Sequence, residues 1–228
     1  MTRTLLASLV LASAVLWLPV IAHADDDNSY AEFDAGSAIF SGKSAQSIGS
    51  LIGAGNVTTG SGSSFSNSTG YRLIGGYQIN PTWGVEASYV DLGESDFSIL
   101  QPGFLNAGNP DYTGGTRVWG WGVAGTGTLP LDDHWALFAR LGAIDAHVKL
   151  FYITNTNLGI LTASNSSADW KATLGAGVNW SFTDDWSVHF GWDHYHKLGN
   201  SHTTGEATVN LISVGIVYAF PLAYEFGG

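Results

Sequence analysis

Apolar and polar residues alternate along most of the chain after residue 28, and short runs rich in Gly, Ser, Asn, Asp or Pro interrupt the alternation. Successive side chains of a strand point to opposite faces, so a period of two predicts β-strands with one apolar face. Eight such segments are predicted, at residues 30–40, 69–79, 83–92, 116–129, 135–153, 168–182, 186–198 and 207–220. An even number of alternating segments of about ten residues is typical of a transmembrane β-barrel.

The predicted connections alternate between short and long. Three of them are tight turns, with the sequences "NPT", "PLDDH" and "TDD", and the other four are longer, at residues 41–68, 93–115, 154–167 and 199–206. Outer-membrane barrels have short turns on the periplasmic side and long loops outside. The pattern therefore predicts an all-β fold, an eight-stranded antiparallel up-and-down transmembrane β-barrel, with strands within about residues 29–220.

A tryptophan follows each tight turn and begins an apolar face. From Trp83, for example, the same face carries Val85 and Tyr89. Aromatic residues border the lipid-facing band of membrane barrels at both interfaces. We therefore predict a periplasmic aromatic girdle, made of Trp83, Trp135, Trp180, Phe182 and Trp186.

The opposite strand faces carry the few charged residues, with glycines between them. A barrel of about eight strands has an interior just wide enough for side chains, so long charged groups beside small residues fit there. An arginine facing lipid at the bilayer midplane costs about 2–4 kcal/mol, which also favours the interior. The predicted interior polar cluster contains Glu32, Asp34, Arg72, Glu86, Arg140, Asn179 and His189.

Composition narrows the class of protein further. The chain has 228 residues, no cysteine, only 12% charged residues and a formal net charge of −11. Its acidic balance argues against nucleic acid as a partner. Residues 1–24 have a basic start, an apolar run and a small-residue "AHA" site, which predicts a cleaved secretory signal peptide before a barrel domain at residues 25–228.

The stretch "HFGWDHYH" holds the densest group of metal-ligand residue types. Alternation turns His189 and Asp193 inward but His194 and His196 outward, so an interfacial aromatic belt is favoured over a metal site. Ser201 lies beside His202, but a nucleophile needs a positioned base and an orienting third group, and no such motif is found. We expect no metal, no cofactor and no enzymatic activity.

Two stretches, "GGYQINPTWGVEASYVDLG" and "LPLDDHWALFARLGA", resemble the transmembrane domain of the outer-membrane protein A family. The resemblance implies an eight-stranded barrel with an interior salt-bridge cluster that gates a narrow passage. Glu86 and Arg140 match the interior glutamate and one interior arginine of the family. Thr126, Asn179 and His189 replace its lysine, second glutamate and second arginine, so Glu86 is expected to pair with Arg140 or His189 instead.

The end of the last predicted strand, "SVGIVYAF", is similar to the signal read by the barrel-assembly machinery, through Gly215, Tyr218 and Phe220. The sequence thus predicts a monomeric protein of the bacterial outer membrane, in contact with lipopolysaccharide and phospholipid, with a structural or surface role. A narrow passive channel and an adhesion protein acting through its long outer loops are the alternatives. A lipid-modifying enzyme is disfavoured.

Overall fold

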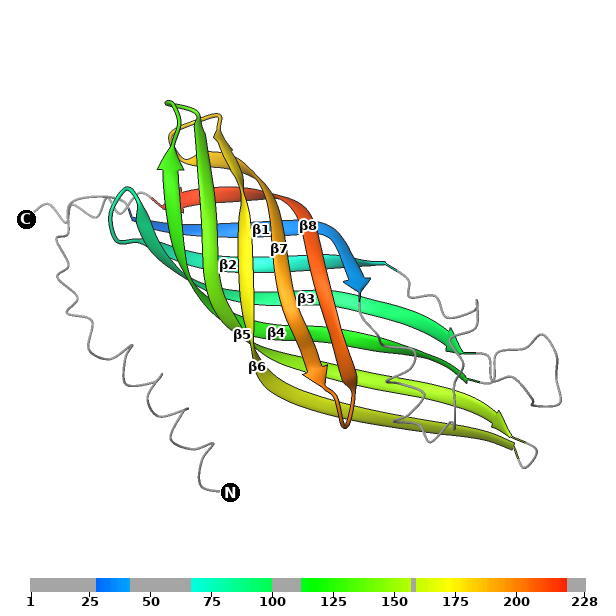
Figure 1. Ribbon diagram of the computed structural model, residues 1–228. Coiled ribbons are helices and arrows are strands. Elements are labelled where there is room, and N and C mark those ends of the chain that lie inside the picture. The colour runs from blue at the N-terminus through cyan, green and yellow to red at the C-terminus, as the bar shows by residue number, and fades with distance from the viewer. Residues whose placement is uncertain (1–27, 42–66, 100–111, 157–158, 221–228) are drawn as a thin grey trace, which may run out of the picture.

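The computed structural model describes residues 28–41, 67–99, 112–156 and 159–220. They form a closed barrel in which each strand pairs with the next in antiparallel fashion and β8 closes on β1 (Figure 1). The strands are β1 (Ser29–Ser41), β2 (Ser68–Gln78), β3 (Trp83–Ile99), β4 (Tyr112–Pro130), β5 (Trp135–Thr156), β6 (Gly159–Ser181), β7 (Trp186–Asn200) and β8 (Gly205–Phe220). The predicted eight-stranded barrel is confirmed. No helix among these residues is long and apolar enough to cross a membrane.

The predicted strand limits are correct to within one residue at the end with the tight turns and too short at the other end. β3 and β4 continue through much of the predicted loop 93–115, and β5 and β6 through most of 154–167. The pairs Ile99 with Tyr112 and Thr156 with Gly159 end these two hairpins. Strands beyond the bilayer need no apolar face, so their residues give no alternation by which the sequence would reveal them.

The extended hairpins project past their neighbours, as Figure 1 shows for β5 and β6. β6 pairs with β5 over its full length but with β7 only from Thr173 to Ser181. A bulge between Asp91 and Gly93 marks the point where β3 leaves the barrel wall. Gly93 has a φ of 73°, a conformation that favours glycine.

The three tight turns share one device, which explains the repeated tryptophans. In the first turn, Asn80 Oδ1 accepts hydrogen bonds from the backbone N–H groups of Thr82 and Trp83. In the second, Asp132 Oδ1 accepts from His134 and Trp135, both at 2.8 Å. In the third, Thr183 Oγ1 accepts from the N–H of Trp186. Such side chains replace a backbone partner in a turn, so each tryptophan is held at the first residue of its strand.

The Asp132 turn predicts a specific acid sensitivity. Hydrogen bonds from the N–H groups of His134 and then Trp135 lower the pKa of the Asp132 carboxyl below its usual value. A carboxyl with a lowered folded-state pKa stabilises the fold above its unfolded pKa of about 3.9 and loses that contribution as the pH falls through the folded value. Asp132→Asn keeps a hydrogen-bond acceptor but has no titrating group. Below about pH 4 we therefore expect the urea midpoint of the wild type to fall relative to that of Asp132→Asn. Parallel midpoint curves would contradict this assignment.

The lumen has two layers of side chains. Near the tight-turn end lies a polar layer, described below. Beyond it, toward the long hairpins, an apolar plug fills the barrel with side chains that are at most 4% exposed. The plug is formed by Ala38, Val90, Leu92, Val118, Ile144, Ala146, Val148, Tyr195, Leu198, Val209 and Leu211. The apolar packing inside this barrel is thus concentrated in the half nearer the long hairpins.

Candidate functional site

Arg72 lies at the centre of the polar layer and is almost fully buried. Its guanidinium is ion-paired with Asp34 at 2.5 Å, with Asp193 at 2.6 Å and more distantly with Glu32 at 3.5 Å. Asp34 and Arg72 are register partners on β1 and β2, so their side chains point inward at the same level. A guanidinium has five donors and suits several carboxylates at once. Arg72 therefore ties β1, β2 and β7 together across the lumen.

Arg140 makes a second, looser set of contacts nearer the tight turns. Its guanidinium lies 3.3 Å from Glu32, 3.6 Å from Glu86 and 3.9 Å from Asp193. The Tyr30 ring lies over Gly76 of β2, and its hydroxyl donates a 2.6 Å hydrogen bond to Glu86 on β3. The Glu86–Arg140 pairing, one of the two expected, is thus present in the structure.

His189 does not take the other expected pairing, with Glu86. Its Nδ1 lies 2.9 Å from Asn179 Oδ1, the neighbouring residue across β6 and β7, and 3.6 Å from Glu32 Oε1. The Phe138 ring packs on the imidazole with centroids 4.5 Å apart, and the Arg140 guanidinium lies 4.8 Å from the same ring. His189 is therefore directed toward β1 instead of β3.

Two glycines supply the space that the long side chains occupy. A Cβ on Gly175 would meet Asp193 Oδ1 and, at 2.6 Å, Arg140 Cγ. A Cβ on Gly215 would meet Asp34 Oδ1 and, at 2.5 Å, the carbonyl oxygen of Phe33. Small residues beside large charged ones thus have a direct steric cause in this narrow barrel.

The structure brings all seven residues of the predicted interior polar cluster inside the barrel and adds two that the prediction omitted. Asp193 contacts both arginines, and Tyr30 contacts Glu86. Alternation already predicted that Asp193 faces inward with His189, although the predicted cluster did not include it. Alternation also places Tyr30 on the face of Glu32, so it would have identified Tyr30 as well. Which partner each residue meets across the lumen depends on the strand register, which one sequence does not give.

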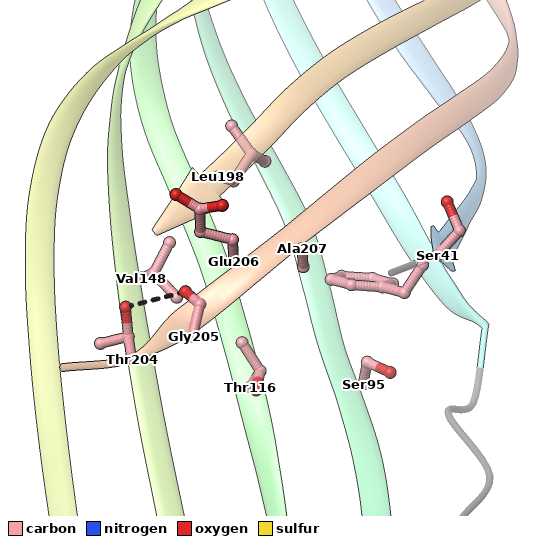
Figure 2. A pocket seen from close by; sticks show the side chains of 10 residues that line it. Ser41, Ser95, Thr116, Val148, Leu198, Thr204, Gly205, Glu206 and Ala207 are labelled. Atoms are coloured by element: carbon pink, nitrogen blue, oxygen red, sulfur yellow. Dashed lines mark hydrogen bonds between the residues drawn. The ribbon is translucent and has the colours of Figure 1, made fainter. Parts of the chain in front are cut away.

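A vestibule of about 280 Å³ opens below the cluster at the tight-turn end. Its walls include Tyr30, Glu32, Glu86, Arg140 and Asn179. At the opposite end, beyond the apolar plug, the cavity lined by Val148, Leu198 and the start of β8 measures only about 20 Å³ (Figure 2). That volume admits about one water molecule. The two ends of the lumen thus differ sharply in the space that they offer.

All five residues predicted for the periplasmic girdle lie at the tight-turn end and point outward. Their exposed fractions range from 39% for Trp180 to 61% for Trp83. A second aromatic group, which the sequence prediction omitted apart from the belt around His194, lies at the other end of the same face. It comprises Tyr71, Tyr89, Trp119, Trp121, Trp170 and Trp192. Trp119 stacks on His147 with centroids 4.2 Å apart. The two groups border an exposed apolar band.

The residues of the predicted assembly signal end the last strand. Phe220 pairs with Ser29 at the seam between β8 and β1, and the Tyr218 ring packs edge-on against Phe220 and 4.7 Å from Trp186. Gly215 has the steric role given above. Reading by an assembly machinery stays a prediction. The predicted signal peptide, 1–24, lies outside the described residues.

A closed antiparallel barrel of eight strands, with an apolar outer band between two aromatic girdles and charges inside, is an integral β-barrel of a bacterial outer membrane. Residues 24–222 match the OmpA-like transmembrane domain, and the chain belongs to that family. It is located in the bacterial outer membrane, with the tight turns on the periplasmic side.

Two relatives are the outer membrane proteins A of Shigella dysenteriae and Escherichia fergusonii, each 24% identical over 163 residues. The match covers 70% of this chain and 42% of each relative, so the chain spans less than half of their length. Among solved structures, Neisserial surface protein A is 14% identical with a TM-score of 0.48, covering 84% of this chain and 97% of that one. OprG of Pseudomonas aeruginosa is 10% identical with a TM-score of 0.49, covering 85% and 96%.

Proposed function

We propose that this protein is a closed structural barrel of the outer membrane that does not conduct ions in its resting state. The observation that carries the proposal is the apolar plug, whose side chains are at most 4% exposed. An ion crossing this layer would lose its hydration against side chains that are mostly apolar, which is strongly unfavourable. The barrier to ions is then the plug and not the salt bridges below it.

This proposal predicts the outcome of a conductance measurement. We expect folded wild-type protein to give no resolvable channels in planar lipid bilayers. Glu86→Ala is expected to give no channels either, because it removes an ion-pair partner of Arg140 but leaves the apolar plug in place.

A 16-stranded porin in the same bilayer serves as the positive control, since barrels of that size leave an aqueous channel. Openings by the wild type would contradict the closed barrel. Openings only by Glu86→Ala would place the gate at the salt bridges instead.

A surface role fits the same geometry. The hairpins β3–β4 and β5–β6 extend past the barrel wall as paired strands, and paired strands hold their side chains in fixed positions. The proposal includes contact with lipopolysaccharide and phospholipid along the apolar band, insertion by the barrel-assembly machinery, and a monomeric state.

The proposal does not include catalysis. Ser201 Oγ lies 3.1 Å from Nδ1 of the adjacent His202 in the β7–β8 turn. The backbone N–H of His202 donates a hydrogen bond to Asn200 Oδ1, so neither of these two partners of the histidine is a carboxylate. A nucleophile and base without an orienting group do not form a hydrolytic site.

A further inference from the structure

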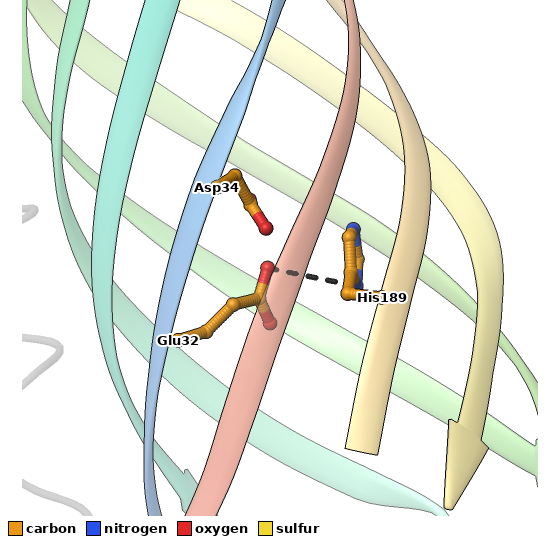
Figure 3. A group of neighbouring side chains, drawn as sticks. All are labelled: Glu32, Asp34 and His189. Atoms are coloured by element: carbon orange, nitrogen blue, oxygen red, sulfur yellow. Dashed lines mark ion pairs between the residues drawn. The ribbon is translucent and has the colours of Figure 1, made fainter.

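Three side chains of the polar layer converge from two strands that lie on either side of β8. Glu32 and Asp34 come from β1 and His189 from β7, and each is at most 3% exposed. One possible ligand atom from each lies within 4.8 Å of the others. Figure 3 shows the two carboxylates and the imidazole facing one another across the ribbon of β8.

Two atoms of this group are buried without a hydrogen-bond partner among the described residues. They are Asp34 Oδ1 and His189 Nε2. The second oxygen of Asp34 is held by Arg72. Asn179 Oδ1 is an acceptor, so the 2.9 Å contact requires the proton on His189 Nδ1 and leaves a lone pair on Nε2. Metal-binding histidines and carboxylates typically have their other polar atom fixed by such second partners.

The charges of the polar layer do not balance. Four carboxylates are buried, on Glu32, Asp34, Glu86 and Asp193, and two guanidinium groups, on Arg72 and Arg140, are buried with them. With all four carboxylates ionised and His189 neutral, the formal excess is two negative charges. The inward-facing Asp169 and Lys171 lie further along β6, opposite Ala146 and Ile144, and offset each other. Ionising all four carboxylates inside the barrel is costly, and one divalent cation would stabilise the ionised form.

We propose that Glu32, Asp34 and His189 bind one divalent transition-metal ion of the Zn²⁺ class. Imidazole with carboxylates is a ligand set suited to Zn²⁺, and the chain has no thiolate to offer. Zinc bonds to nitrogen and oxygen are about 2.0–2.2 Å long, so the side chains close inward on the ion. The periplasmic vestibule, whose wall includes Glu32 and Asn179, supplies the route of entry.

The test is a calorimetric titration in which ZnCl₂ is added to folded, chelator-treated protein in detergent. We expect saturable one-to-one binding and a rise in the unfolding temperature with free zinc, because an ion that binds only the folded state stabilises it. His189→Gln should weaken binding by more than about 100-fold, and Asn179→Ala, which removes the positioning partner, by about 10–100-fold. His147→Gln, which alters an exposed outward histidine beside Asp145, should leave the affinity unchanged.

Substitution with Co²⁺ identifies the ligands independently of stability. The visible absorption bands of bound Co²⁺ should be present in the wild type and His147→Gln and lost in His189→Gln. Heat-dependent gel migration verifies that each variant is folded before titration, and Asn179→Ala decides the question where His189→Gln does not fold. The absence of one-to-one binding in the wild type, or wild-type affinity in folded His189→Gln or Asn179→Ala, would overturn the proposal. Neither result depends on whether the barrel conducts.

Discussion

Arg72→Ala is expected to lower the free energy of unfolding by about 3–5 kcal/mol, the range found when one partner of a buried ion pair is removed. Arg72 holds Asp34, Asp193 and Glu32 inside the barrel. Without its guanidinium, Arg140 alone faces the buried carboxylates of the polar layer, and buried charges without partners are costly. The measurement is urea unfolding of the protein in lipid vesicles, followed by tryptophan fluorescence.

The matched control is Arg117→Ala on the outer face of β4. Arg117 also forms an ion pair with a carboxylate, Asp91, at 2.9 Å, but its side chain is 55% exposed. An exposed pair of this kind contributes less than about 1 kcal/mol. Equal losses for the two variants would mean that the interior network contributes no more than a surface contact does, which contradicts the role given to Arg72.

The second large effect is expected on the lipid-facing side. Leu141→Arg should cost about 2–4 kcal/mol, because it places a charge near the bilayer midplane. Leu141 is 68% exposed on β5, midway in sequence between Trp135 of the periplasmic girdle and His147, which stacks on Trp119 of the second aromatic group. The same unfolding measurement in vesicles reports the loss.

Leu131→Arg is the control for position, since Leu131 is also exposed but lies in the β4–β5 turn. An arginine near the interface costs only about 0–1 kcal/mol. If the two variants lost the same stability, the band between the girdles would not face the lipid core.

The period-two pattern was sufficient to predict the barrel, because lipid imposes strict alternation on every strand that crosses the membrane. The same reasoning explains its failure beyond the bilayer. In β6, residues 159–167 are strand without any requirement for an apolar face, and the sequence there looks like a loop. The tight turns were predictable because Asn80, Asp132 and Thr183 have side chains that close them locally.

The sequence was sufficient to predict which side chains face the interior of the barrel, but not which of them contact one another. Parity places Glu86, Arg140 and His189 on inward faces, but the contact of His189 with Asn179 and Glu32 follows from the stagger between strands. The apolar plug was not predicted for the same reason, because it also depends on how the strands are staggered. Leu211 sits on a face that carries the polar Ser213, and Leu198 turns inward only because the register shifts between Tyr195 and Leu198, so alternation alone does not reveal that they pack together.

The end of the barrel at which each connection lies has a practical consequence for display of foreign peptides. Ser29 and Phe220 are paired at the periplasmic end, whereas the β5–β6 hairpin reaches furthest on the opposite side among the described strands (Figure 1). A peptide inserted between Thr156 and Gly159 would be carried on a rigid two-stranded stem to the cell exterior. A partner attached before β1 or after β8 would remain beneath the membrane, so one scaffold offers an outward-facing presentation site and two inward-facing tethers.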